Sequence, residues 1–171
     1  MINQKKTIKI AIASGKGGTG KTFVSTNLFY VLQENEIKTT IVDCDSEEPN
    51  VCGFLKGKFT ESINCFVKIP EIDNNKCKFC RKCSNWCQFN SIIILPSLKF
   101  TQVNPNICHS CGACFVACNY DAIKEVDYEI GIISKYNYSN CGKIIESKIN
   151  IGVERSSEVI RQTLRSIDND S

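Results

Sequence analysis

Eight consecutive residues near the start of the chain have the types and spacing that bind a chain of phosphates. They are Gly15, Lys16, Gly17, Gly18, Thr19, Gly20, Lys21 and Thr22, which fit the pattern G-x-x-x-x-G-K-S/T. Glycines let the backbone bend so that successive N–H groups point at phosphate oxygens, and a following helix N-terminus adds positive potential. In such a loop Lys21 reaches the β- and γ-phosphates and the Thr22 hydroxyl binds Mg²⁺. The pattern therefore predicts a site for ATP and Mg²⁺.

Eight of the twelve cysteines form two runs with the spacing C-x₂-C-x₂-C-x₃-C. The first run is Cys77, Cys80, Cys83 and Cys87, and the second, 31 residues later, is Cys108, Cys111, Cys114 and Cys118. This is the spacing of the bacterial ferredoxin run, which holds iron–sulfur clusters. Zinc is the chemical rival, because four-cysteine zinc sites use pairs of C-x₂-C. Two duplicated quartets with tight triple spacing favour iron, so the runs predict two [4Fe–4S] clusters.

The elements that must position the phosphate loop alternate between strand and helix. Residues 7–14 are rich in β-formers, residues 21–34 have helical spacing of apolar side chains, and residues 38–42 are β-branched. This order predicts a βαβ unit whose two strands are parallel neighbours. Open α/β sheets bind ligands at the carboxyl ends of their strands, where the loop would lie.

The cysteine runs interrupt this rhythm from about residue 67 to residue 126. The sequence therefore predicts an insert at 67–126 between a first segment, 1–66, and a return segment, 127–171. Within the return segment we expect a strand at 129–134 and a helix at 157–167. The helix has Ser157 as a candidate N-cap, and its apolar face consists of Val159, Ile160, Leu164 and Ile167.

Composition narrows the possible classes of protein. The 171 residues are 42% hydrophobic with a formal net charge of +3 and no long basic run, which argues against a nucleic-acid partner. No segment approaches the roughly 18 apolar residues of a membrane span, so no membrane partner is expected. Twelve cysteines without a secretory leader indicate reduced, metal-binding thiols in the cytoplasm.

Lys16, directly after the first glycine of the loop, resembles the deviant Walker A loop of the MinD, Mrp and nitrogenase-iron-protein group of ATPases. The segment Asp43-Cys44-Asp45 is similar to the D-x-D segment of the same group. The resemblance implies that Lys16 crosses a homodimer interface to the partner's nucleotide, that Asp43 positions the attacking water and that Asp45 contacts the Mg²⁺ shell. Period-two strand geometry would place both carboxylates facing the loop, although a solvated turn is the alternative for Asp45.

Two-cluster ferredoxins use the fourth cysteine of each run on the other cluster. The resemblance implies one ligand set of Cys77, Cys80, Cys83 and Cys118, and another of Cys108, Cys111, Cys114 and Cys87. Gln88 and Asn119 replace the proline that usually follows such a run. Lys76, Lys78, Arg81 and Lys82 surround the first run. They either raise its potential and dock an acidic redox partner, or are merely solvated.

Taken together, the chain resembles MinD-type P-loop ATPases with an inserted ferredoxin domain. This implies an α/β fold whose parallel sheet is incomplete, because the family's Walker B strand and D-x-P-P-G turn do not appear before Ser171. We therefore expect the N-terminal portion of a longer ATPase. The expected function couples nucleotide state to the insert in metallocofactor maturation or electron delivery, with an unidentified redox protein or metalloprotein as partner. The alternatives are an electron-transfer module with a decayed ATPase half and an Fe–S cluster carrier.

Overall fold

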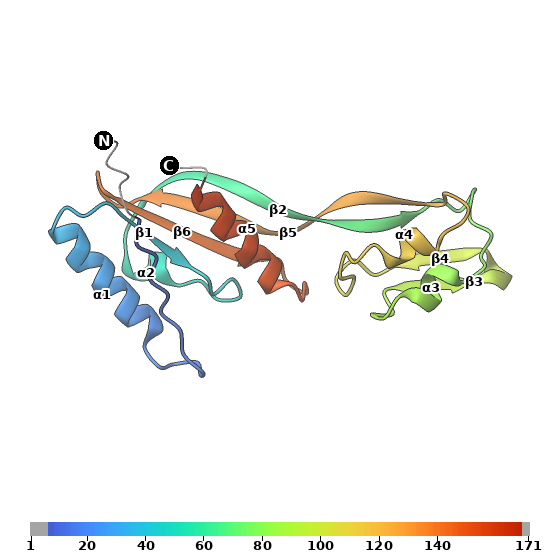
Figure 1. Cartoon of the computed structure of the whole chain (residues 1–171), viewed down its shortest axis with the longest axis horizontal. Helices are drawn as coiled ribbons and strands as arrows, with labels where there is room; N and C mark the ends of the chain where they lie inside the picture. The colour runs from blue at the N-terminus through green and yellow to red at the C-terminus, as the bar shows by residue number, and fades with distance from the viewer. Residues whose placement is uncertain (1–6, 169–171) are drawn as a thin grey trace.

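The computed structural model describes residues 7–168, which form two lobes joined by a long two-stranded ribbon (Figure 1). The first, here called the α/β lobe, contains a four-stranded sheet in the order β1-β6-β5-β2. Its elements are α1 (Lys21–Glu34), β1 (Thr39–Asp43), α2 (Val51–Phe54), β2 (Lys58–Ile72), β5 (Ile123–Asn137), β6 (Gly142–Ile149) and α5 (Ser156–Asp168). β1 and β6 pair in parallel, and the other two pairs are antiparallel. The predicted α/β class is confirmed, but the sheet is mixed rather than parallel.

The predicted first strand, 7–14, does not form. This segment has no strand partner among the described residues, and the side chains of Ile8 and Ile10 are 76% and 65% exposed. β1, its expected neighbour, pairs with β6, where Ile41 lies opposite Ile144. An extended segment becomes a strand only when its N–H and C=O groups meet those of a neighbour. β1 is an edge strand of the sheet, yet residues 7–14 form no ladder with it, so the predicted βαβ unit is wrong, although α1 has its predicted range.

β2 and β5 build the ribbon. They pair antiparallel from Lys58 opposite Asn137 to Ile72 opposite Ile123, so each strand belongs to the sheet at one end and carries the second lobe at the other (Figure 1). The predicted insert limits at 67 and 126 fall inside these two strands. Gly131 is required where β5 passes β6, because a Cβ there would lie 2.5 Å from the carbonyl oxygen of Lys148.

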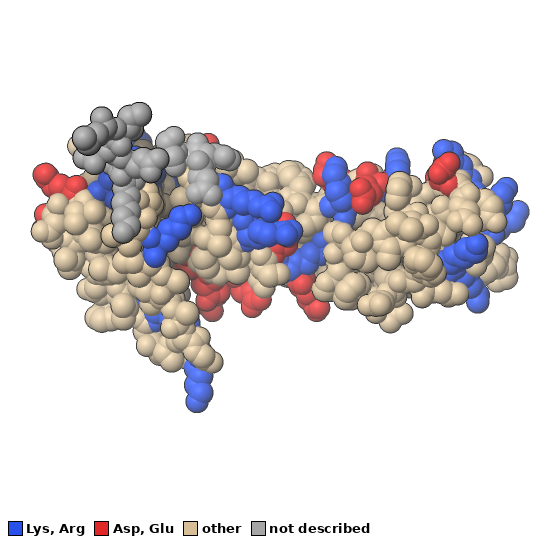
Figure 2. Space-filling model, viewed as in Figure 1, with Lys and Arg blue, Asp and Glu red and all other residues tan. Residues whose placement is uncertain are grey.

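The second lobe, residues 73–122, is here called the cysteine lobe. Its elements are α3 (Lys82–Trp86), β3 (Ile92–Leu95), the short 3₁₀ helix η1 (Pro96–Leu98), β4 (Phe100–Val103) and α4 (Ala113–Ala117). β3 and β4 form an antiparallel hairpin, and Ile92, Ile94 and Ile123 pack with Cys83 in its core. Figure 2 shows that Lys and Arg side chains predominate at the end of this lobe farthest from the α/β lobe.

Helix α5 lies against β5 and β6 and covers the predicted range 157–167. The amide of Glu158 already donates to the Arg155 carbonyl, 3.0 Å away. Ser157 therefore lies inside the first turn, and its predicted role as the N-cap is wrong. No helix in the described part of the chain is long and apolar enough to cross a membrane.

The buried face of α5 differs from the predicted one. Val159 and Thr163 are fully buried, whereas Leu164 is 47% exposed. Thr163 is tolerated inside because its hydroxyl donates to the carbonyl of Val159 at 2.8 Å. Val159 packs with Ile130 and Ile145 in the largest core cluster, which fixes the helix over the point where the ribbon leaves the sheet.

Candidate functional site

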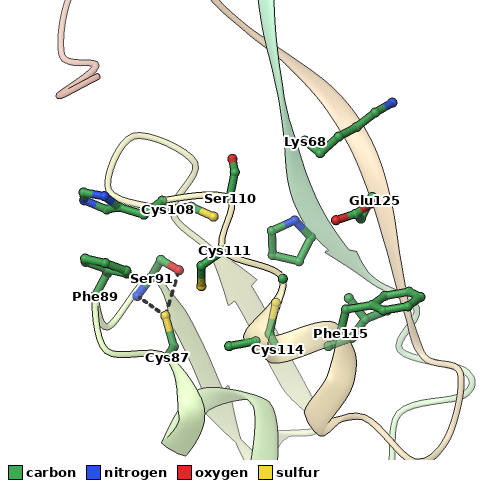
Figure 3. A pocket seen from close by; sticks show the side chains of 15 residues that line it. Lys68, Cys87, Phe89, Ser91, Cys108, Ser110, Cys111, Cys114, Phe115 and Glu125 are labelled. Carbon is green, nitrogen blue, oxygen red and sulfur yellow. Dashed lines mark hydrogen bonds between the residues drawn. The ribbon is translucent and has the colours of Figure 1, made fainter. Parts of the chain in front are cut away.

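The cysteine lobe has two cavities, and each is lined by four cysteines from the two runs. The proximal cavity, whose empty volume of about 430 Å³ includes open solvent, is lined by Lys68 and Glu125 of the ribbon as well as by residues of the cysteine lobe (Figure 3). The distal cavity, about 310 Å³, lies toward the far end. The cysteines of the proximal cavity are Cys87, Cys108, Cys111 and Cys114. Those of the distal cavity are Cys77, Cys80, Cys83 and Cys118. The structure thus brings together the same two quartets that the sequence predicts.

Backbone geometry repeats with the same offset as the cysteines. Left-handed φ angles occur at Arg81 (62°) and at Gly112 (74°), each directly before a five-residue helix. The helix carries the third cysteine of its run, and the chain then leaves in extended conformation at Cys87 and at Cys118. The fourth cysteine therefore emerges at the opposite end of the helix from the first three, which is why it lines the other cavity.

Cys87 has the best-developed set of donors. Burial raises the pKa of its thiol. Hydrogen bonds lower that pKa by more than burial raises it, and they include those of the Ser91 hydroxyl and amide, 3.1 and 3.3 Å from Sγ (Figure 3). The net pKa of Cys87 is therefore below its usual value. Burial raises the pKa of Cys114 to about 11. At the distal cavity the amide of Phe79 donates to Cys77 Sγ at 3.3 Å. Donors of this kind stabilise a thiolate, which is the form that binds metal.

The thiols ring cavities rather than converge on one point. Among residues 7–168, no three His, Cys, Asp or Glu side chains lie close enough to hold a single metal ion. A cubane spreads its four thiolates over four irons, so its ligands stand farther apart than those of one ion. His109 is exposed, lines the proximal cavity and stacks on Phe89 with ring centroids 3.7 Å apart.

A buried arginine joins the two lobes. Arg155, directly before α5, is only 7% exposed and donates to the Ser110 hydroxyl at 2.9 Å and to the Pro105 carbonyl at 3.0 Å. Its Nε is buried without a hydrogen-bond partner, and no carboxylate pairs with it in the described part of the chain. Ser110 lines the proximal cavity between two of its cysteines. Arg155, from the α/β lobe, therefore places a buried positive charge in contact with a residue that lines the proximal cavity.

The phosphate loop lies before α1 and is exposed on most of its surface. Gly18 and Gly20 have φ angles of 70° and 89°, which side chains with a Cβ rarely adopt. Lys21 Nζ lies 3.3 Å from Ser14 Oγ and 3.5 Å from the Lys16 carbonyl oxygen, so its ammonium folds over its own loop. The first amide with an intrahelical bond is that of Val24, which leaves the preceding amides available to an anion.

The two predicted carboxylates behave differently from each other. β1 ends at Asp43, so Asp45 lies in the following loop and the expected period-two placement on one strand is wrong. Asp43 is 8% exposed and accepts hydrogen bonds from the amides of Asp45, Asn50 and Val51 at 3.0, 3.0 and 3.1 Å. Asp45 is exposed and accepts only the amide of Glu48 among the described residues, at 3.3 Å. Asp43 therefore holds the loop that presents Asp45.

We expect Asp43→Asn to lower the free energy of unfolding by about 3 kcal/mol, because it replaces one acceptor oxygen by an amide group facing two backbone N–H donors. Denaturant unfolding of the whole chain measures this loss. Asp45→Asn is the matched control and should change stability by less than about 0.5 kcal/mol. Equal effects of the two substitutions would contradict a structural role for Asp43.

The four remaining cysteines lie outside both cavities. Burial, then the nearby Glu146, raises the pKa of Cys52 to about 12, and burial raises that of Cys65 to about 11. Cys44 is exposed, and the Cys141 amide donates to the Ser139 hydroxyl oxygen at 3.1 Å. High pKa values keep Cys52 and Cys65 protonated at neutral pH, which is typical of inert structural thiols.

Comparison with known proteins gives both a family and partial relatives. A family model, the CobQ/CobB/MinD/ParA nucleotide binding domain, matches residues 10–169. The chain is 31% identical over 157 residues to an uncharacterized protein of Methanocaldococcus jannaschii, covering 90% of this chain and 54% of the relative. It is 50% identical over 44 residues to an uncharacterized ATP-binding protein of the same organism, covering 26% of this chain and 17% of the relative. It is 49% identical over 43 residues to an iron–sulfur cluster carrier protein of Saccharolobus solfataricus, covering 25% and 14%. The chain thus spans about half the length of the first relative.

Proposed function

Because the chain belongs to the CobQ/CobB/MinD/ParA nucleotide-binding domain family, we propose that it is an ATP-binding iron–sulfur protein. In this proposal the cysteine lobe is a ferredoxin-type insert that holds two [4Fe–4S] clusters, and the nucleotide state of the α/β lobe is coupled to it. The full-length protein would hydrolyse ATP and act in metallocofactor maturation or electron delivery.

The donor sets suit two such clusters. Each cavity is lined by four cysteines, and no histidine or carboxylate is needed to complete either set. The buried, unpaired Nε of Arg155 supports an anionic group in the proximal cavity, since a buried guanidinium without a counter-charge is costly. Clusters held there would supply one-electron chemistry, while hydrogen bonds from Ser91 to Cys87 would stabilise the thiolate.

The nucleotide would be held by the phosphate loop. The loop amides and Lys21 would bind the phosphates, Thr22 would bind Mg²⁺, and Asp45 would contact the Mg²⁺ shell. Lys16 is exposed, as a residue that reaches the nucleotide of a second copy must be. We therefore propose a homodimer that forms across the nucleotide.

Coupling rests on one observation, the buried contact of Arg155 with the cysteine lobe. Arg155 directly precedes the helix that packs on β5 and β6, and its guanidinium holds the 105–110 segment through Ser110 and Pro105. A shift of α5 would therefore move both the hydrogen bonds and the positive charge beside the proximal cavity. By linkage, a tenfold change in ATP affinity on reduction corresponds to a shift of about 59 mV in a one-electron potential.

We expect Mg-ATP to shift the potential of the proximal cluster in the loaded chain and Arg155→Met to remove the shift. An EPR-monitored redox titration with and without Mg-ATP measures it. Arg155→Lys keeps the charge and should retain part of the effect. Ser110→Ala removes one acceptor and tests the contact if Arg155→Met fails to fold. A full shift in Arg155→Met, with iron content and ATP binding intact, would contradict the coupling.

The match to an iron–sulfur cluster carrier protein favours cluster transfer as a second candidate function. In that case the clusters are cargo, and an apo acceptor protein should gain iron from the loaded chain faster than the chain loses iron to a chelator. Stable clusters that never transfer would leave the electron-delivery function as the better one.

A further inference from the structure

The cysteine lobe carries positive charge and no negative side chain over a long stretch of sequence. The whole chain has 21 Lys and Arg against 18 Asp and Glu, yet residues 74–120 contain no Asp or Glu at all. The cations of this stretch are Lys76, Lys78, Arg81, Lys82 and Lys99, and all five are exposed. A surface with exposed cations and without carboxylates has a positive electrostatic potential, which attracts negatively charged partners.

Two of these five cations line the distal cavity, and none of them lines the proximal one. Lys78 and Lys82 line the distal cavity, which has no acidic residue in its lining. The proximal cavity is lined by both Lys68 and Glu125, so its charged side chains balance. Figure 2 shows Lys and Arg side chains predominating at the distal end of the lobe. The four cations nearest the first run, Lys76, Lys78, Arg81 and Lys82, are here called the tip cations.

Exposed aromatic side chains accompany the tip cations. Trp86, on α3, is 57% exposed, and Tyr120, which lines the distal cavity, is 44% exposed. Exposed aromatic residues flanked by basic ones are typical of a transient docking surface. The aromatic side chains lose solvent-exposed area on binding, and the charges steer the approach of the partner. A loaded distal cluster would bring about two negative charges, which the four tip cations still exceed.

We propose that the tip cations, with Trp86, form the docking surface for an acidic one-electron donor protein, which reduces the distal cluster. The inference rests on the proposed function, because it requires a cluster in the distal cavity. The donor loses one electron and the distal cluster gains it, with no bond broken and no proton moved. The proximal cavity, beside Arg155, then lies between the distal cluster, where the electron enters, and the α/β lobe.

The test uses the cluster-loaded whole chain and a reduced plant-type [2Fe–2S] ferredoxin, a strongly acidic donor, as the probe. Stopped-flow absorbance gives the second-order rate constant for reduction at several ionic strengths. We expect the wild-type rate to fall steeply as salt is added. The double substitution Lys78→Glu with Lys82→Glu should slow the reaction at least about tenfold at low salt. Because both residues line the cavity, Lys76→Glu with Arg81→Glu provides a second variant that leaves the lining unchanged.

The matched control is Lys56→Glu with Lys58→Glu, which makes the same change of net charge on exposed residues of the α/β lobe. It should change the rate by less than about twofold. An equal loss in tip and control variants, or a wild-type rate independent of salt, would overturn the proposal. Tip-dependent binding of a single-stranded oligonucleotide, without any dependence of ferredoxin reduction on the tip, would also overturn it. A chain that assembles no clusters fails the proposed function instead, and iron analysis before mixing separates the two failures.

Discussion

Lys21→Ala is expected to abolish measurable Mg-ATP binding, whereas Lys16→Ala should leave binding by the monomer nearly unchanged. Lys21 Nζ already lies over its own loop, 3.5 Å from the Lys16 carbonyl oxygen, where it would meet the β- and γ-phosphates. Losing a charge-assisted contact of this kind costs roughly 1.5–3 kcal/mol, or roughly 10- to 150-fold in affinity. Isothermal calorimetry on the whole chain measures the change.

Comparing the Lys16 and Lys21 variants separates nucleotide binding by one chain from hydrolysis that requires the proposed homodimer. Lys16 is exposed, and in the proposed homodimer it would stabilise transition-state charge on the nucleotide of the second copy, as an arginine finger does in trans. Lys16→Ala should therefore impair concentration-dependent phosphate release from the full-length protein rather than nucleotide binding. If Lys16→Ala lost binding as completely as Lys21→Ala in a demonstrably monomeric sample, the role across the dimer would have to be abandoned.

Cys87→Ala is expected to destroy the proximal cluster, although Cys87 belongs to the first run. The side chain lines the proximal cavity with Cys108, Cys111 and Cys114, so iron should fall from about eight to about four atoms per chain. Cys118→Ala, the equivalent substitution in the second run, should remove the distal cluster instead. EPR of the reduced protein distinguishes the two variants, because each keeps a different centre.

The two halves of the repeat differ in a hydrogen-bond donor beside the fourth cysteine. Ser91 donates to Cys87, whereas the position equivalent to Ser91 in the second half is Ala122. Ser91→Ala should therefore affect the proximal centre alone. Damage in Cys87→Ala that is confined to the cluster at Cys77, Cys80 and Cys83 would show local ligation and would refute the crossed arrangement.

The cysteine lobe follows the sequence closely because its constraints are local. The 31-residue offset recurs in the backbone, since Phe79 and Ser110 both have φ of 52° and lie at equivalent positions of the two halves. Short helices between fixed turns leave the fourth cysteine of each run little choice of direction. The two quartets could therefore be predicted from spacing and resemblance alone.

The α/β lobe could be predicted less well, because strands depend on partners that the local sequence does not reveal. Residues 7–14 have strand composition but no partner in the described structure, and β1 pairs with a strand about 100 residues later in the chain. Arg155 was missed for the same reason, since its contact with Ser110 spans 45 positions and no motif marks it. The asymmetry between Ser91 and Ala122 was visible in the repeat and could have identified Ser91.

The most direct test of the central claim is the metal content of the whole chain after anaerobic purification, combined with EPR after reduction. Two [4Fe–4S] clusters predict about eight irons and about eight acid-labile sulfides per chain, with the spectrum of two reduced four-iron centres. Zinc in place of iron, or iron without labile sulfide, would contradict the account.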